Sequence, residues 1–229
     1  IRSARAYFLN TVMEYDAVLT RYGGSDDADA DVYDFGINEI DGMKVASPYI
    51  WRQNDLGKVA PHNAYSSSSA IRQGIVDFGY DGIEAKGIFE FNIEDTKPEA
   101  ESANRLFLGF RPGGSSEFKY DESTKTYLRF VDGQAHLEEI DKTQIAAKNI
   151  IVQMVSMGFY ADGVHRSVDN VGEGRGYLLT NGTVQEIIWK KADRSSKTEF
   201  LDLNENPIKL NPGQTWVEVF DQSKEMIIE

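Results

Sequence analysis

The stretch GYLLTNGTVQEIIW, residues 176–189, decides the fold class of this chain. Two runs rich in apolar and β-branched residues flank the dipeptide Asn181-Gly182 at its centre. Asn-Gly is favoured in a type I′ turn, because both central residues of that turn need a positive φ. The stretch therefore predicts an antiparallel β-hairpin.

Further strands are predicted on both sides of this hairpin. Asn211-Pro212-Gly213 is a second strong turn signal, and Phe118 to Val131 repeats the hairpin pattern around a charged turn. Beyond Ala146 the chain is predicted to be mostly strand. The predicted segments there are residues 150–154, 176–180, 183–189, 198–203 and 215–220.

The N-terminal third shows helical spacing instead. A first helix is expected from Ser3, a second from Ser25 or Asp26, and a third after the serine run 66–69, whose hydroxyls can cap a helix. Short strands are expected at residues 17–19 and 88–93. The apolar face of the first helix would consist of Ala4, Tyr7, Phe8, Val12 and Tyr15.

These patterns predict an α+β fold, with helices and short strands in the N-terminal third and mainly antiparallel β-sheet in the C-terminal half. The 229 residues are enough to bury a core as one large domain or two small ones. We expect one α+β unit over residues 1–229. A softer subdivision separates a mixed α/β part, 1–145, from a mostly β part, 146–229.

Composition excludes several classes of protein. The 24 Lys and Arg against 37 Asp and Glu give a net charge of −13, which disfavours nucleic acid as a partner because phosphates are met by clustered cations. No apolar run approaches the roughly 20 residues of a spanning helix. The absence of cysteine excludes disulfides, thiolate nucleophiles and cysteine-ligated metals. The chain begins at Ile1 without a targeting stretch, so we expect a trimmed piece of a longer chain.

Two stretches of the sequence partly resemble a calcium-binding loop and a dinucleotide-binding motif, but neither matches its motif fully. Aligning Asp27, Asp29 and Asp31 with an EF-hand loop places Val32 at the glycine position and Asn38 at the position of the bidentate glutamate. A helix N-terminus explains these acids better, because carboxylates there face unpaired N–H groups. The glycines at 172, 174 and 176 precede a predicted strand, whereas a dinucleotide site precedes a helix. No cofactor and no metal are therefore expected.

A loop between residues 51 and 65 is the first candidate binding site. It combines aromatic, cationic, imidazole and amide groups, a mixture that suits recognition of a polar ligand. The competing interpretation is that His62 and Asn63 pin a long loop through backbone contacts. The candidate residues of this loop are Trp51, Arg52, His62, Asn63 and Tyr65.

Four further residues extend the candidate site. Arg2 and Arg5 lie three apart, so on a helix both guanidinium groups can point the same way and grip a carboxylate or phosphate. A solvated helix face paired with nearby acids is the alternative. Arg129 and His136 bracket the turn at Asp132-Gly133, with carboxylates just beyond. A histidine near carboxylates can act as a general acid or base, but acids are so common here that proximity alone is weak.

Several strings resemble the YerB-like family, described as bacterial lipoproteins of uncharacterised function. The resemblance covers nearly the whole chain, and its motifs recur in order. One departure is the pair Gln134-Ala135, where the family pattern has a basic residue and a proline. The matching strings are RSAR at 2–5, YF at 7–8, YGGS at 22–25, PHN at 61–63, YS at 65–66, YLR at 127–129, Gly133, His136, KNIIVQ at 148–153, GRGY at 174–177, WKK at 189–191 and LNPGQTW at 210–216.

The resemblance implies an extracytoplasmic protein of a Gram-positive cell envelope. It also implies a lipid on a cysteine upstream of Ile1, so that the membrane would be contacted only through an anchor absent from this chain. No catalytic residue carries over, because the family is uncharacterised.

Three hypotheses of function follow. The first is a binding or scaffolding module for an unknown envelope ligand or protein, held between the early helices and the hairpin of Arg129 and His136. The second is a hydrolase of an envelope polymer, with His62 or His136 as acid or base and Arg5 and Arg129 stabilising negative charge. The third is a protein-interaction role for exposed sheet edges.

Overall fold

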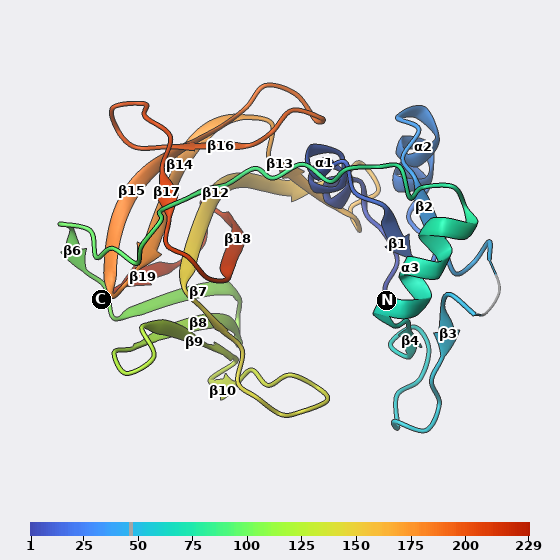
Figure 1. The fold of residues 1–229 in the computed structure, drawn as a ribbon, viewed down its shortest axis with the longest axis horizontal. Coiled ribbons are helices and arrows are strands. Elements are labelled where there is room, and N and C mark those ends of the chain that lie inside the picture. The colour runs from blue at the N-terminus through green and yellow to red at the C-terminus, as the bar shows by residue number, and fades with distance from the viewer. Residues whose placement is uncertain (46–47) are drawn as a thin grey trace. The chain divides into compact units, whose positions relative to one another are not determined.

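The computed structural model describes residues 1–45 and 48–229. The chain divides into two compact units, which are described separately below (Figure 1). Unit 1 comprises Ile1–Ile88 and Asp193–Lys197, and unit 2 comprises Phe89–Ala192 and Thr198–Glu229. The chain thus passes between the units three times. Residue 145, where the sequence indicated a softer subdivision, lies within unit 2.

The secondary structure is α+β, with three helices and antiparallel-rich sheets in the part of the chain that the structure describes. None of these helices is long and apolar enough to cross a membrane. The elements of unit 1 are α1 (Ala6–Tyr15), β1 (Leu19–Arg21), α2 (Asp26–Asp34), β2 (Glu39–Asp41), β3 (Trp51–Arg52), β4 (Ala64–Tyr65) and α3 (Ser68–Asp77).

Two helices of unit 1 begin where their capping residues predict. The first turn of α2 carries Asp26, Asp27 and Asp29, which favour a helix N-terminus because its N–H groups are unpaired. Helix α3 starts after Ser67, whose Oγ accepts a hydrogen bond from the Ala70 N–H at 3.1 Å.

Helix α1 begins at Ala6 rather than at Ser3, so the expected helical placement of Arg2 and Arg5 is wrong. The residues before it are extended, because Ala4 N donates to Gly23 O and Tyr22 N donates to Arg2 O. The expected apolar face is also partly wrong. Phe8 is exposed, whereas α1 buries its Leu9 together with Ala6, Asn10 and Glu14.

Arg21 is the buried cation around which unit 1 is organised. It ends β1, which pairs in parallel with β2, and its side chain is 1% exposed. Its guanidinium pairs with Asp29 of α2, with Glu39 at 2.5 Å and with Asp41 at 3.4 Å. Burial lowers the pKa of Arg21, but the hydrogen bonds to Glu39 and Asp29 outweigh it and raise the pKa overall. One arginine therefore ties one helix and two strands together.

Replacing Arg21 by methionine should destabilise unit 1 by about 3–5 kcal/mol, because it removes the cation and leaves buried acids uncompensated. The loss is measured as a lower opening free energy of the β1 and β2 amides in native-state hydrogen exchange. Arg72→Met on the exposed side of α3 is the control, expected within about 0.5 kcal/mol of the parent. Equal protection in the two variants would refute a central role for Arg21.

A short segment from the second half of the chain completes unit 1. Arg194, in Asp193–Lys197, holds both carboxylate oxygens of Asp31 at 2.6 and 2.9 Å and donates to Asn10 Oδ1 at 2.7 Å. Its guanidinium also lies over the ring of Phe35, 4.7 Å from the centroid. Helices α1 and α2 are thus joined by an arginine that enters from far along the sequence.

Arg194→Lys should lower the opening free energy of α1 and α2 by about 1–3 kcal/mol. The reason is that an ammonium cannot bind both oxygens of Asp31 and also donate a third hydrogen bond to Asn10. Hydrogen exchange should quicken in these helices. Arg175→Lys is the matched control: its ion pair with Glu186 is exposed, so little change is expected. Unchanged exchange in α1 and α2 of Arg194→Lys would contradict this role.

Unit 2 is built from β-strands. Its strands are β5 (Glu90–Phe91), β6 (Glu101–Ser102), β7 (Arg105–Arg111), β8 (Gly114–Asp121), β9 (Thr126–Val131), β10 (Gln134–Ala135), β11 (Ala146–Ala147), β12 (Asn149–Phe159), β13 (Arg166–Asp169), β14 (Gly172–Thr180), β15 (Thr183–Lys191), β16 (Glu199–Leu201), β17 (Lys209–Leu210), β18 (Thr215–Asp221) and β19 (Met226–Ile228).

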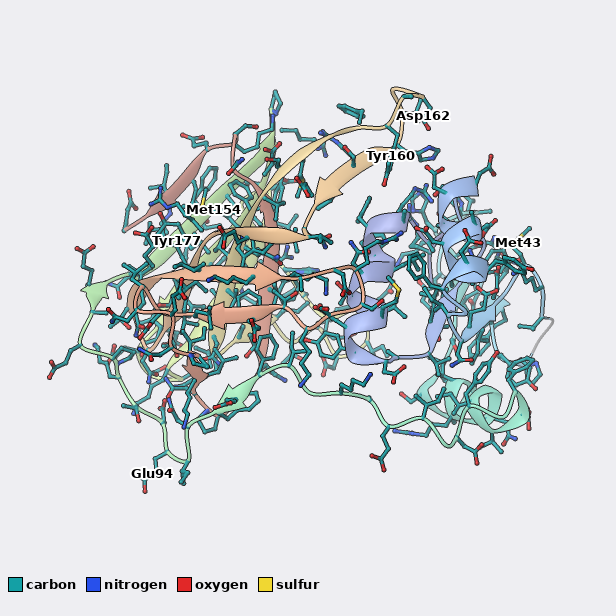
Figure 2. The ribbon with its side chains drawn as sticks, turned by 90° about the horizontal axis from the view of Figure 1, so that it is seen from above. Met43, Glu94, Met154, Tyr160, Asp162 and Tyr177 are labelled. Carbon is teal, nitrogen blue, oxygen red and sulfur yellow. The ribbon has the colours of Figure 1, made fainter. Side chains whose placement is uncertain are left out.

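Two sheets of unit 2 share one core. One sheet has the order β10-β9-β8-β7-β19 and the other β13-β12-β14-β15-β16; in Figure 1, β7, β8 and β9 are green, β19 is red, and β12, β14 and β15 are yellow to orange. Leu106, Leu108 and Phe118 from the first sheet pack with Ile150 and Val152 from the second. Met154 and Tyr177, on neighbouring strands of the second sheet, also contact this core (Figure 2). The two layers bury a common apolar interior.

The Asn-Gly hairpin forms as predicted. Asn181 and Gly182 have φ of 50° and 71°, and Thr180 pairs with Thr183 in the antiparallel β14–β15 ladder. The hairpin between Phe118 and Val131 is also confirmed, as β8 and β9. The parallel pairing of β12 with β18 has no local sequence signal, because it joins strands more than 50 residues apart.

Two strands have other bounds than the sequence predicts. The glycines at 172–176 lie within β14, where a Cβ at Gly174 would meet the Trp189 ring at 2.7 Å and one at Gly176 would meet Val152 O at 2.6 Å. Close packing therefore explains Gly174 and Gly176. The strand expected at 88–93 shrinks to Glu90–Phe91, and Ile93 is fully exposed.

A buried polar network closes one end of the second sheet. Asn149 donates to Asn211 O at 2.9 Å and accepts from Thr180 Oγ1 at 2.9 Å. Beside it, Lys148 Nζ donates to Asp95 at 2.8 Å and to Asn181 at 2.5 Å. Two strings on which the family resemblance depends, KNIIVQ at 148–153 and LNPGQTW at 210–216, therefore meet in this network.

Candidate functional site

The candidate loop of unit 1 hangs from the short β3–β4 hairpin. Trp51 pairs with Tyr65, and Arg52 with Ala64, in antiparallel register. Asn63 is 4% exposed and accepts from Arg52 Nη1 at 2.9 Å, while its amide donates to Asn54 at 2.8 Å. Asn63 thus clamps the base of the loop, which supports the loop-pinning interpretation for this residue.

His62 projects from the clamped loop and meets Arg2. Arg2 Nη1 lies 3.0 Å from His62 Nδ1, and both side chains are exposed. A guanidinium can only donate, so Nδ1 must be the unprotonated acceptor and Nε2 carries the hydrogen. Within residues 1–45 and 48–229, neither side chain contacts a carboxylate. The pair therefore presents only hydrogen-bond donors to solvent.

Four other candidates of unit 1 make contacts of their own. Arg5 donates to Ser3 Oγ at 3.0 Å and to Ala4 O at 2.8 Å, so it is occupied by its own chain. Trp51 Nε1 donates to Gln53 Oε1 at 3.0 Å, and Tyr65 accepts from Lys58 at 3.1 Å. The guanidinium of Arg52 lies 4.0 Å from the centroid of the Tyr22 ring, beneath the loop.

Unit 2 contains a second arginine–histidine pair. Arg129 on β9 places Nη1 at 2.5 Å from His136 Nδ1, which again makes Nδ1 the acceptor. The Arg129 guanidinium covers the Trp216 ring at 4.4 Å and lies 3.6 Å from the carboxylate of Glu218. Its Nε is buried and has no hydrogen-bond partner in the described structure.

Burial shifts the pKa values of Glu218 and His136 in this cluster. Burial raises the pKa of Glu218, although hydrogen bonds from Ser116 and the charge of Arg129 act against it. Burial and the nearby Arg129 lower the pKa of His136, so its imidazole is neutral at pH 7. The carboxylates near His136 in the sequence do not contact its ring.

Titration of His136 by NMR should therefore give a pKa below the ordinary value of about 6.5. Arg129→Gln should raise that pKa by removing the adjacent charge. Because the folded protein binds the proton less well, stability should be full above the ordinary value and fall as the pH drops toward the folded-state pKa. Arg166→Gln, outside the cluster, should leave the titration unchanged. A parent pKa at or above 6.5 would contradict the structure.

The nine candidate residues thus fall into two groups. Arg2, Arg5, Trp51, Arg52, His62, Asn63 and Tyr65 belong to unit 1, and Arg129 and His136 belong to unit 2. A single site uniting both groups stays a prediction.

The third histidine, His165, binds Asp162 at 2.5 Å near the tip of the β12–β13 hairpin, beside Tyr160 (Figure 2). Hydrogen bonds from His165 and Val164 lower the pKa of Asp162 to about 2.

Metal ligation has no support in the described residues, which contain no cluster of three or more His, Asp or Glu side chains suited to a cation. The acids of α2 instead hold arginines, Asp29 with Arg21 and Asp31 with Arg194. Sequence reasoning missed both arginines, because each meets acids from other elements. It also missed a cavity beside residues 111–114.

Comparison with known families identifies the class of protein. Residues 1–81 match the domain described as "Protein of unknown function (DUF3048) N-terminal domain", and residues 107–217 match the corresponding C-terminal domain. The chain belongs to this two-domain family, to which the YerB-like resemblance pointed.

A relative of known sequence and a solved structure support the assignment. The protein named "Putative lipoprotein YerB" of Bacillus subtilis (strain 168) is 26% identical over 222 residues, which are 96% of this chain. The chain spans 65% of the length of that relative. The crystal structure of YerB protein from Bacillus subtilis matches with a TM-score of 0.84 at 23% identity, covering 99% of this chain and 76% of the other. The two chains share a fold.

Proposed function

We propose that this chain is an extracytoplasmic binding module of the cell envelope, attached to the membrane through a lipid outside the present sequence. The relative named as a lipoprotein supports the location. The observation that carries the binding role is the exposed Arg2–His62 pair, whose nitrogens lie 3.0 Å apart and offer only donors. A donor-only surface suits a ligand rich in acceptors, such as a carboxylate or phosphate group of an envelope polymer.

The surroundings of the pair strengthen this proposal. The Arg52–Asn63–Asn54 clamp holds the loop in place, so His62 is positioned before a ligand arrives. Arg2 has no carboxylate partner in the described structure although the protein has 37 acids. A free cation on so acidic a protein is a local site of positive charge, and it can attract an anion that the net charge repels.

Binding fits the two histidines better than hydrolysis does. A histidine base is usually oriented by a carboxylate on its second nitrogen. His62 and His136 each have an arginine at Nδ1, and neither contacts a carboxylate within the described residues. Arg5, which the hydrolase hypothesis requires beside a histidine, is bonded to Ser3 and Ala4 instead.

Arg2→Gln and His62→Ala should each weaken binding of the purified chain to isolated Gram-positive cell walls by about tenfold, because each removes a donor to a charged acceptor. Co-sedimentation at low and high salt measures the effect, and binding by the parent should fall as salt rises. Walls stripped of anionic polymers should retain less protein.

Arg72→Gln makes the same charge change on an exposed face of unit 1 and is the matched control. The proposal fails if Arg2→Gln and Arg72→Gln lose binding equally, because bulk charge would then be the cause. It also fails if neither Arg2→Gln nor His62→Ala alters retention on the walls.

A further inference from the structure

Unit 2 contains a cavity of about 570 Å³ at one end of its first sheet. Three connections surround it: the turn between β7 and β8, the turn after β9 at Asp132, and the link between β18 and β19 at Lys224 and Glu225. A volume of this size is typical of small-molecule sites. The cavity is separate from the Arg2–His62 pair, which belongs to unit 1.

The floor of the cavity lies on the face of β7 that turns away from the core. Leu106 and Leu108 of β7 are buried in the core, whereas Phe107 and Gly109 line the cavity. A Cβ at Gly109 would lie 3.6 Å from both Phe107 Cε1 and Glu225 Cβ, so the glycine leaves open the space between them. The pairing of β7 with β8 shifts register between Gly109 and Arg111, a bulge of the kind that redirects side chains near sites.

The connections around the cavity are already ordered. Asp132 Oδ1 accepts from Ser115 N at 2.7 Å, and Asp132 N donates to Ser115 O at 3.0 Å, so the two turns are tied together. In the third connection Lys224 N donates to Asp221 O at 2.9 Å. A ligand would meet a largely pre-formed site.

Three charged side chains at the rim of the cavity have no side-chain partner in the described structure. In the described structure the side chains of Arg111, Lys224 and Glu225 make no hydrogen bond, ion pair or ring contact. The two cations, Arg111 and Lys224, and the two carboxylates, Asp132 and Glu225, give the lining of the cavity a net charge of zero. A purely anionic ligand would be repelled by the acids and a purely cationic one by Arg111 and Lys224.

We propose that this cavity binds a zwitterionic ligand with an apolar side chain, namely a short peptide with free termini. The fork of Arg111 receives the peptide carboxylate, aided by Lys224. Glu225, aided by the free oxygen of Asp132, accepts from the peptide ammonium. The ring of Phe107 packs against an aromatic or aliphatic side chain of the peptide.

The test is a set of NMR and calorimetric titrations of the full chain with L-Ala-L-Phe, its N-acetyl derivative and its C-terminal amide. Saturable binding is expected for the dipeptide, with each blocked derivative at least about tenfold weaker. Arg111→Gln should bind dipeptide and amide equally weakly, and Glu225→Gln should bind dipeptide and N-acetyl derivative equally weakly. Gly109→Leu should abolish binding by filling the cavity.

Arg166→Gln and Glu99→Gln are exposed changes elsewhere in unit 2 and should leave the dipeptide affinity unchanged. The proposal is overturned if the dipeptide gives no saturable shifts, or if the N-acetyl derivative binds as well as the dipeptide, which would make the site one for anions. Retained affinity in both Arg111→Gln and Glu225→Gln would also overturn it. Loss of wall binding in Arg2→Gln has no bearing on these outcomes, because the two sites lie in different units.

Discussion

Unit 1 depends on one buried charge, the guanidinium of Arg21. Two of its acid partners lie on β2 and the third on α2, so the helix and the two strands are fixed by a single side chain. Buried Asp41 also accepts from the Gly23 and Met43 N–H groups, so one carboxylate holds both the arginine and the chain next to each strand. Hydrophobic burial is not directional, so the apolar cluster of Ala4, Leu9, Ala28 and Val32 would not by itself specify this arrangement. Directional ionic contacts supply the specificity instead.

In unit 2, neutral amide and hydroxyl groups fix one end of the second sheet by directional hydrogen bonds. Its apolar interior lies between two sheets, but the end of the second sheet is fixed by the amides of Asn149 and Asn211 and the hydroxyl of Thr180. Each buried polar atom in this network finds a partner, which is the condition under which such networks stabilise a fold. Two of the strings shared with the YerB-like family, KNIIVQ at 148–153 and LNPGQTW at 210–216, supply Asn149 and Asn211 to this network, so these two strings carry information about folding.

Local signals in the sequence were sufficient to predict turns and the starts of two helices. Asn181-Gly182 specifies its turn, and Ser67 and the acids of α2 specify helix starts, because the deciding contacts lie within four residues. The start of α1 was predicted wrongly because Ala4 is extended by hydrogen bonds to residues near position 24. The contact of His62 with Arg2, 60 residues away, could not be predicted from spacing for the same reason. The composition of the loop predicts a polar binding site there, which stays a prediction, and it does not indicate which arginine His62 contacts.

The placement of Arg194 has a consequence for the order of events during synthesis. Domains that are continuous in sequence can fold as soon as their last residue leaves the ribosome, and the N-terminal one usually folds first. Here the hydrogen bonds from Arg194 to Asn10 of α1 and to Asp31 of α2 are unavailable until residue 194 has been made, after β12, β14 and β15 of the other unit. The first unit to be translated is therefore completed only after most of the second unit has been made. Until residue 194 is made, α1 and α2 can meet only through their direct packing, in the apolar cluster of Leu9, Ala28 and Val32.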